Sequence, residues 1–356
     1  MDTVLETLDT EALQRFQALR SDAVSAVTER FYATHGSAYE RFGARGRQAC
    51  REDLAFHLDF LYPVLEFGLL LPMLDYLGWL ASVLTERCIP VEHVAQSLNW
   101  LAEFYAVHLG APDGLIVARA LQTAEMRFLD ADYPLAELSQ SHEPWPETDA
   151  FEAALLAGDN RVALNILYGC IDQGHSLIEI EHHIIQPALY IIGQKWQSNQ
   201  VSVAQEHIAT AIAQSVMTAG LLRSVPQSAT NKRVLLACVE GNSHALGLRM
   251  LADAFQLDGW EVQYLGANVP SSALVGQIAK WRPNLVGLSV SFAHQLQTVK
   301  QVIVQMQKRL AGDRPVTMVG GLAINRYNQL AQMVGADAYC GDARTAVQLA
   351  NQMLNR

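Results

Sequence analysis

The stretch Arg233-Val-Leu-Leu-Ala-Cys-Val-Glu-Gly-Asn-Ser-His-Ala-Leu-Gly247 decides the fold of the C-terminal third of the chain. Residues 233–239 form a nearly continuous apolar run, which is typical of a parallel strand that is buried on both faces. The polar loop that follows leads into a helix expected over 245–257. This order of strand, loop and helix predicts the start of an alternating α/β fold.

The same alternation continues along the rest of the chain. Further strands are expected over 262–265, 285–290 and 316–319, with a helix over 295–309. Residues 231–356 are therefore predicted to form a doubly wound parallel sheet of the Rossmann or flavodoxin type. In such sheets, ligands bind beyond the carboxyl ends of the strands.

Three loops place small or polar residues at that edge of the predicted sheet. The first carries His244, the second Ser289 and Ser291, and the third Gly320 and Gly321. An imidazole nitrogen is a good ligand for a transition metal, and paired glycines leave space for a bulky group. A single loop histidine is more often a loop or capping residue, but the combination favours a ligand site. The sequence lacks GxGxxG after its first strand and also lacks GxxxxGK[ST], which argues against a dinucleotide site and a P-loop.

Taken together, the three loops resemble the pattern DxHxxG, SxL and GG of the cobalamin-binding family. The resemblance implies that His244 is the lower axial ligand of cobalt and that Ser289 contacts the displaced nucleotide tail of the cofactor. It also implies that Gly320 and Gly321 make room for this tail. The resemblance spans 231–350, and its matching segments are Asn242-Ser-His244-Ala-Leu-Gly247, Ser289-Val-Ser291, Gly320-Gly321, Gly266 to Pro270 (Gly-x-x-x-Pro) and Gly335-Ala-Asp337.

Two departures from this pattern concern the residues around the cobalt ligand. Asn242 stands where the family has Asp, and Ser291 stands where it has Leu. A neutral amide can orient the second ring nitrogen of His244, but it cannot raise the basicity of the imidazole as a carboxylate does. We therefore expect a weaker His244–cobalt bond than in relatives with Asp, and a more polar wall at Ser291.

Residues 150–223 have the pattern of four short helices, with breaks near residues 158, 175 and 199. The segment 150–225 resembles the helix-bundle cap that covers the upper face of cobalamin. Trp196, followed after nine residues by Glu206-His207, resembles the signature of CarH-type photoreceptors and implies adenosylcobalamin. Gln197 stands where those proteins have a histidine that becomes an upper ligand in the light. The alternative is a core tryptophan beside a solvated Glu-His pair.

The residues expected to contact the cofactor come from both segments, and His244 is the expected ligand to cobalt. No Ser-His-Asp arrangement and no suggestive pair of carboxylates is visible, so a sensor or carrier is favoured over an enzyme acting alone. The expected contact residues are Asn242, Ser243, His244, Leu246, Gly247, Leu265, Gly266, Ser289, Val290, Ser291, Gly320, Gly321, Trp196, Glu206 and His207.

Residues 1–140 have a helical pattern, and prolines at 63, 72 and 90 punctuate them. They are too long, too apolar and not basic enough for a helix-turn-helix domain. Arginines precede a helix expected over 52–64, aromatic residues are dense, and His57 lies on the expected buried face. Arginines pair well with carboxylates such as the propionates of a tetrapyrrole. The alternative is a solvated arginine face with a core histidine. If this domain binds a bilin such as biliverdin, the residues expected to contact it are Arg45, Arg47, Arg51 and His57, with Arg41 nearby.

The order of a helical domain (1–140), a polar linker (139–149), a cap and a cobalamin-binding domain resembles photocobilins, which hold cobalamin and a bilin. The formal net charge of −11 argues against broad binding to DNA or anionic membranes. No apolar run is long enough to span a bilayer, and no signal peptide is visible. The five cysteines are scattered, which favours reduced thiols in the cytoplasm.

The sequence thus predicts a cobalamin photoreceptor with an all-helical N-terminal domain, a four-helix-bundle cap and a C-terminal parallel-sheet domain. Light would break the cobalt–carbon bond and change a homo-oligomer, dimer or tetramer, or its contact with a signalling partner. Direct DNA binding and membrane contact are not expected. A corrinoid protein that carries methyl groups for a methyltransferase system is the alternative function, and a cobalamin store or chaperone is a third.

Overall fold

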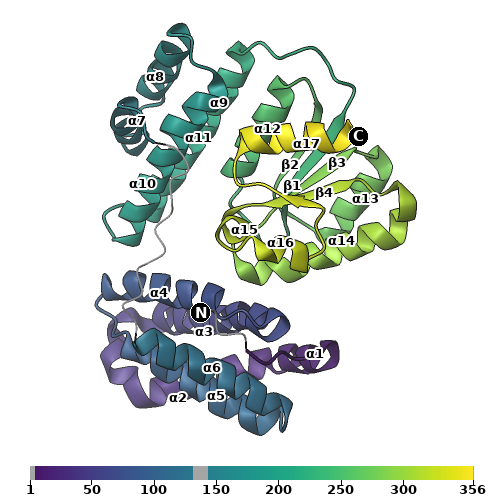
Figure 1. The fold of residues 1–356 in the computed structure, drawn as a ribbon. Helices are drawn as coiled ribbons and strands as arrows, with labels where there is room; N and C mark the ends of the chain where they lie inside the picture. Colours follow the sequence, from purple (N-terminus) through teal and green to yellow (C-terminus); the bar gives the residue numbers. More distant parts are fainter. Residues whose placement is uncertain (1–4, 131–142, 356) are drawn as a thin grey trace. The chain divides into compact units, whose positions relative to one another are not determined.

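The computed structural model describes residues 5–130 and 143–355 of the chain. The chain divides into two compact units, Met1–Glu137 and Leu138–Arg356, and Figure 1 draws the elements of each. No helix within the described ranges is long and apolar enough to cross a membrane.

The first unit is built from helices. They are α1 (Thr10–Ala18), α2 (Arg20–Tyr39), α3 (Gly43–Phe67), α4 (Leu71–Thr85), α5 (Glu92–His108) and α6 (Asp113–Leu129). Helices α5 and α6 pack along each other, and α2 packs on α3. The prediction of a helical N-terminal domain is confirmed for residues 5–130.

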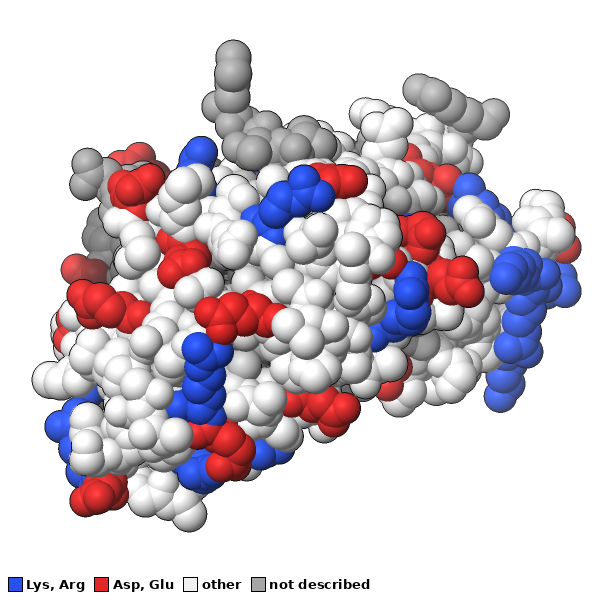
Figure 2. Space-filling view, turned by 90° about the horizontal axis from the view of Figure 1, so that it is seen from below, with Lys and Arg blue, Asp and Glu red and all other residues white. Residues whose placement is uncertain are grey.

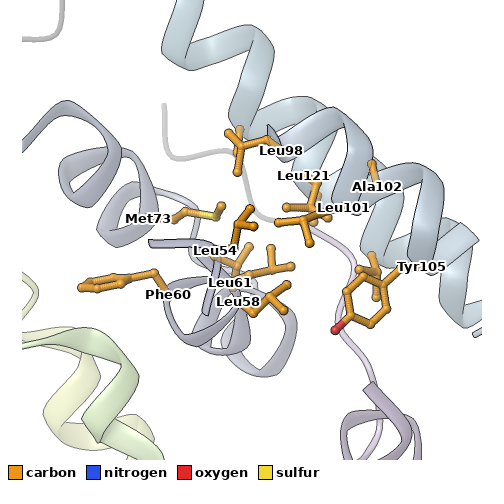
Figure 3. Close-up of a cluster of buried hydrophobic side chains, with 14 of the residues drawn as sticks. Leu54, Leu58, Phe60, Leu61, Met73, Leu98, Leu101, Ala102, Tyr105 and Leu121 are labelled. Carbon is orange, nitrogen blue, oxygen red and sulfur yellow. The ribbon is translucent and has the colours of Figure 1, made fainter. Parts of the chain in front are cut away.

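The core of this unit follows the helical spacing of its leucines. Leu54, Leu58 and Leu61 on α3 are at most 2% exposed, and Figure 3 shows them pointing toward Leu98 and Leu101 of α5. Burial of side chains this size stabilises the fold by about 1.5–3 kcal/mol each. The predicted apolar face of these two helices is confirmed.

Helix α3 is longer than the sequence predicted. It was expected over 52–64, but it begins at Gly43 and ends at Phe67, where Gly68 takes a left-handed conformation (φ 74°). Pro63 was expected to mark a break and instead lies inside the helix. A proline there removes one backbone hydrogen bond, while the burial of its neighbours on α3 favours continuing the helix.

The second unit begins with a bundle that we call the cap, residues 147–223. It consists of α7 (Glu147–Leu156), α8 (Asn160–Asp172), α9 (Leu177–Ile180), a π-helical turn (Glu181–Ile185), α10 (Gln186–Gln197) and α11 (Val203–Arg223). The three predicted breaks are confirmed. Asp159, Ser176 and Ser202 cap the helices that follow them with their side-chain oxygens.

Two features of the cap differ from the prediction. The third helix contains a π-helical turn that the sequence pattern did not indicate. The predicted linker over 139–149 also overlaps folded structure, because α7 begins at Glu147 and the backbone N–H of Trp145 donates to the carbonyl oxygen of His183 (3.0 Å). The ring of Trp145 stacks on that of His183, which fixes this part of the chain on the cap. Residues 139–142 lie outside the described ranges.

The C-terminal domain is a five-stranded parallel sheet in the order β2-β1-β3-β4-β5, so the predicted fold class is confirmed. Its elements are β1 (Arg233–Val239), α12 (Leu246–Leu257), β2 (Glu261–Val269), α13 (Ser271–Trp281), β3 (Leu285–Ser289), α14 (Leu296–Leu310), β4 (Val316–Gly320), α15 (Leu322–Arg326), α16 (Gln329–Met333), β5 (Ala338–Tyr339) and α17 (Ala343–Leu354). Helices α12 and α17 pack together, as do α13 and α14, and the two pairs cover opposite faces of the sheet (Figure 1). This strand order is that of the flavodoxin-like folds.

The cap and the sheet domain share part of their cores. Met250 of α12 packs among the buried side chains of the cap, and Ile178 of α9 packs against the core of the sheet domain. Helix α12 contacts both α9 and α11. Because α12 starts directly after the loop that carries His244, the cap packs on the helix that extends the candidate site.

Candidate functional site

The candidate site lies where β1 and β3 end side by side in the sheet. Here the chain order reverses along the sheet, since β1 has β2 on one side and β3 on the other. In doubly wound folds, ligands bind in the crevice outside the strands at this point. Register pairs Cys238 of β1 with Ser289 of β3, and Ser289 with Gly320 of β4, so the three predicted loops follow at one edge.

Asn242 ties the loops of this edge together. Its side chain is fully buried; Nδ2 donates to the carbonyl oxygen of Ser289 (2.9 Å), and Oδ1 accepts from the backbone N–H of His244 (3.1 Å). The backbone N–H of Asn268, at the end of β2, donates to the carbonyl oxygen of Asn242 (2.9 Å). One amide therefore fixes the loop after β1 against the end of β3.

This role differs from the one expected from the sequence. Asn242 was expected to orient the imidazole ring of His244, but its side-chain donor and acceptor bind backbone groups instead. The loop needs one donor and one acceptor at this position. An ionised aspartate offers only acceptors and cannot donate to the carbonyl oxygen of Ser289.

His244 presents its imidazole ring without a hydrogen-bond partner among residues 5–130 and 143–355. The ring packs edge-on against Phe292, with centroids 5.2 Å apart and planes at 81°. Surrounding protein atoms lower the pKa of His244, and the negative charge of Glu206 raises it by a smaller amount. The imidazole is consequently neutral at neutral pH and has a lone pair for a metal ion.

Two residues of this edge were missed by the sequence reasoning. Gln295 is 2% exposed; its Oε1 accepts from the backbone N–H groups of Ser291 (3.0 Å) and Phe292 (3.2 Å), and its Nε2 donates to the carbonyl oxygen of Gly241 (2.9 Å). Gln295 links the loop after β3 to the loop after β1, across 54 positions of sequence. No local pattern reveals such a contact, nor the packing of Phe292 on His244.

The paired glycines allow two backbone segments to approach each other closely. Gly321 has φ 96°, and a Cβ atom there would lie 2.4 Å from the carbonyl oxygen of Val290. A Cβ atom on Gly320 would lie 2.9 Å from the carbonyl oxygen of Cys340. Ser289, Val290 and Ser291 are all buried. The glycines are thus required by the fold, whether or not they also make room for a ligand.

The remaining predicted residues of the sheet domain lie beside this edge. Leu265 and Gly266 are inside β2 rather than in a loop after it, and Gly266 (φ 78°) forms a bulge in the pairing with β1. Leu246 and Gly247 start α12, and Ser243 is exposed in the loop. The Gly335-Ala-Asp337 segment contacts the start of β4. Asp337 binds Arg314 and accepts a hydrogen bond from the backbone N–H of Thr317 (2.8 Å).

The cap contributes Glu206 and His207 near the start of α11. Glu206 Oε1 accepts from the hydroxyl of Thr210 (2.8 Å), and Oε2 lies 2.5 Å from Nδ1 of His207. The Glu206 carboxylate lies near enough to His244 to raise the pKa of this histidine. Trp196 is half-buried near the end of α10 and packs against the cap core.

The residues predicted for a second ligand in the first unit are not gathered at one place. Arg47 pairs with Glu29 (2.5 Å) and Arg51 Nη2 donates to the hydroxyl of Ser25 (3.2 Å), so both face α2. Arg45 is exposed. His57 is 2% exposed and lies against α4, where its Nδ1 is 2.9 Å from the hydroxyl of Tyr76. Burial lowers the pKa of His57 to about 4.

An aromatic and histidine cluster in the first unit was missed. The rings of His35 and His93 lie with centroids 4.0 Å apart, and Nδ1 of His93 is 2.6 Å from the hydroxyl of Tyr39. Phe31 packs on both histidines, and Trp100 lies beside His35. The dense aromatics were visible in the sequence, but the contact between α2 and α5 that joins the two histidines was not.

Several charged side chains of the first unit form ion pairs. Four exposed arginines pair with carboxylates of other elements, and Figure 2 shows acidic and basic side chains interspersed on one face of the molecule. A concentrated basic surface, which non-specific binding to DNA requires, is not formed by these arginines. The pairs are Arg15–Asp113, Arg30–Glu103, Arg47–Glu29 and Arg119–Glu6.

Comparison with known proteins identifies the second unit. Residues 232–350 and residues 148–219 each match a family model described as a B12 binding domain. The second unit consists of B12-binding domains. The site at the ends of β1 and β3 is therefore the edge of a B12-binding domain, with a B12-binding cap segment beside it.

Relatives of these B12-binding domains include repressors and corrinoid proteins. The chain is 24% identical over 265 residues to the HTH-type transcriptional repressor CarH of Myxococcus xanthus, covering 73% of this chain and 87% of the repressor. It is 29% identical over 191 residues to dimethylamine corrinoid protein 2 of Methanosarcina mazei, covering 50% and 87%. The monomethylamine corrinoid protein of Methanosarcina barkeri shares the fold, with a TM-score of 0.50 at 19% identity over 58% of this chain and 97% of that protein.

Proposed function

We propose that the chain is a cobalamin photoreceptor that binds adenosylcobalamin with His244 as the lower axial ligand. One observation carries the ligand assignment: the imidazole of His244 is neutral and has no hydrogen-bond partner in the described residues, at the sheet edge where ligands bind. A free imidazole nitrogen suits cobalt. Asn242 supports the ligand by fixing the backbone of its loop.

The residues of the cap fit the upper side of this cofactor. Adenosylcobalamin supplies a cobalt–carbon bond that breaks in the light. Glu206, held by Thr210 and His207, has carboxylate oxygens that can accept hydrogen bonds from ribose hydroxyls. Trp196 offers an aromatic surface for shielding the adenosyl group. Similarity to CarH over most of the chain supports the sensor function.

The output we propose is a change in assembly in the cytoplasm. Loss of the adenosyl group would let the cap repack on α12 and so alter a homo-oligomer, dimer or tetramer, or the contact with a signalling partner. CarH is a transcriptional repressor by name. For this chain we propose no direct DNA contact, because several exposed arginines of its first unit pair with carboxylates and the net charge of the chain is −11.

We also propose that the first unit binds a bilin such as biliverdin. Arg47 and Arg51, which lie four residues apart on α3 and both face α2, support the proposal, since arginines pair with propionates and Arg47 lies over the ring of Tyr32 at 4.8 Å. His57 has no part in it, because it is buried and bonded to Tyr76. Purified protein mixed with biliverdin should gain a red absorption band, which arginine-to-alanine variants should weaken. Absence of a band would remove this part of the proposal.

The alternative function is a corrinoid protein that carries methyl groups for a methyltransferase. The similarity to dimethylamine corrinoid protein 2 favours it. The two functions differ in their response to light. The protein should be loaded with adenosylcobalamin, and its absorption spectrum and apparent mass recorded in the dark and after green light. A spectrum and mass that both change support the photoreceptor; a light-insensitive sample that accepts methyl groups supports the carrier.

A further inference from the structure

Two buried carboxyl groups and a partly exposed arginine lie together where the cap meets α12. Glu181 is fully buried at the first position of the π-helical turn, and Asp253 of α12 is 1% exposed. Arg249, one turn earlier on α12, donates from Nε to Oδ1 of Asp253 (2.8 Å). No other element of the described chain brings two buried carboxyl groups together in this way.

The arrangement requires a proton between the two carboxyl groups. Both oxygens of Glu181 and Oδ2 of Asp253 lack any partner other than each other in the described residues, and the two side chains are within hydrogen-bonding reach. Two buried carboxyl groups within hydrogen-bonding reach of each other cannot both be ionised. Burial, and then the negative charge of Asp253, raise the pKa of Glu181 well above its usual range.

The proton belongs on Glu181. Asp253 is paired with Arg249, which stabilises the ionised form of its carboxyl group. Glu181 has no cation of its own, so the neutral acid form is favoured there. A protonated Glu181 can then donate its hydrogen bond to the free oxygen of Asp253, which leaves the pair with a net charge that Arg249 neutralises.

The position of the pair relates it to the candidate site. Glu181 lies on the π-helical turn, a rare geometry that often occurs at functional sites. Asp253 and Arg249 lie on α12, which starts at Leu246, two residues after His244. Arg249 also lies over the ring of Tyr264 (6.0 Å), whose hydroxyl donates to the carbonyl oxygen of Ala245 in the His244 loop (3.2 Å).

We propose that protonated Glu181 is a positioning residue that holds the π-helical turn of the cap on α12, and that loss of its proton releases the cap from this helix. When the proton leaves, two adjacent negative charges face one Arg249, and the carboxylates repel each other. Any effect of this release on cofactor binding rests on the proposed function. The contact between the cap and α12 is independent of the proposed function.

Most of the other titratable groups near the pair are bonded to other residues. Besides burial, Asp253 raises the pKa of Glu181 and Arg249 lowers it. The other groups on the elements packed around it include Glu179, bonded to Ser176 and 3.7 Å from Arg344; Glu152, bonded to Lys195; Asp172, bonded to Arg223; His183, bonded to the carbonyl oxygen of Glu143; buried His182; and Tyr264, bonded to Ala245.

The direction of the pH effect follows from the raised pKa of Glu181. Unfolded chains lose this proton near the ordinary pKa of glutamate, about 4.3, whereas the folded protein keeps it. Stability from this group is fully present below about pH 4 and is lost as the pH rises toward the folded pKa. Over that interval the folding equilibrium constant falls about tenfold per pH unit through Glu181 alone.

The test uses the full chain without cofactor and three forms of it: wild type, Glu181→Gln and the matched control Glu179→Gln. The amide introduced by Glu181→Gln would keep a donor for Asp253 without a titrating proton, and Glu179 is a partly exposed carboxylate one half-turn away. Infrared difference spectra at neutral pH should show a protonated carboxylic acid in wild type and in Glu179→Gln. The signal should be missing in Glu181→Gln. Equal signals in all three forms would overturn the proposal.

Hydrogen exchange tests the release of the cap on the same samples. After correction for intrinsic exchange, protection of residues 177–190 and 246–257 in wild type should fall by about tenfold per pH unit in excess of Glu181→Gln, from about pH 5 upward. The proposal is contradicted if the two forms show the same pH dependence, or if Glu181→Gln loses protection at every pH. In the form loaded with cobalamin, release of the cofactor should speed up with pH in wild type only. Failure of cobalamin to bind would affect that last readout and leave the first two intact.

Discussion

Replacement of Asn242 by Asp changes one amide nitrogen to oxygen at the centre of the site. From the structure we expect a large loss in the free energy of unfolding. The wild-type amide donates to the buried carbonyl oxygen of Ser289 and accepts from the N–H of His244. In Asn242→Asp, the carboxyl group can keep both bonds only while it is protonated. The ordinary pKa of an aspartate is about 3.9. For each pH unit above this value, keeping the carboxyl group protonated lowers the free energy of unfolding by about 1.4 kcal/mol.

The expected loss of stability follows from this difference. At pH 7 the variant should be less stable than wild type by up to about 4 kcal/mol, which is 1.36 kcal/mol for each of roughly three pH units. Near pH 4 the two proteins should be nearly equal. Because the folded pKa of the new carboxyl group is raised, its stabilising proton is present at low pH and lost as the pH rises.

The assay is unfolding of the full chain by urea at several pH values, followed through a spectroscopic signal from the second unit. Asn325→Asp is the matched control, because Nδ2 of Asn325 also donates to a carbonyl oxygen, that of Gly341 (3.2 Å), but in an exposed place. The control should lose at most about 1 kcal/mol at any pH. An Asn242→Asp protein as stable as wild type at pH 7, with no pH-dependent difference, would refute the assignment of Asn242 to the loop.

Other positions give further expectations. His57, whose pKa burial lowers to about 4, contributes stability that is present above pH 6.5 and lost as the pH falls, about 3 kcal/mol by pH 4 in unfolding of the first unit; a flat acid response would contradict it. Gly321→Ala should destabilise the sheet domain by more than about 2 kcal/mol in thermal unfolding, because its Cβ would meet the backbone of Val290, whereas Gly312→Ala, where nothing lies near, should not. Leu101→Ala should cost about 2–5 kcal/mol in urea. Glu206→Gln should weaken binding of adenosylcobalamin by a larger factor than that of methylcobalamin in equilibrium titrations; equal factors would argue against a ribose contact.

Much of the fold was predictable because it depends on local patterns. The apolar run of β1, the alternation of strand and helix, and the breaks near residues 158, 175 and 199 are all local features, and each has its expected place. The π-helical turn and the continuation of α3 through Pro63 were not predicted. In both, burial against other helices decides the geometry, and the residues that supply it are far away in the sequence.

The candidate site was predictable in outline and not in its bonding. The sequence located the loops of His244, Ser289 and Gly320 at one edge, since parallel strands must end together. It did not reveal that Asn242 binds backbone groups of two loops, or that Gln295 links them. These bonds depend on which backbone atoms face a buried side chain, and a single sequence does not contain that information.

The most direct test is the electron paramagnetic resonance spectrum of the protein loaded with cobalamin and reduced to cobalt(II). A single axial nitrogen splits the cobalt signal, and the splitting pattern depends on the nitrogen isotope. We predict that labelling of histidine with nitrogen-15 changes this pattern in wild type, and that His244→Ala loses the axial nitrogen of the protein. A pattern that histidine labelling leaves unchanged, in a protein that still binds cobalamin, would contradict ligation by His244.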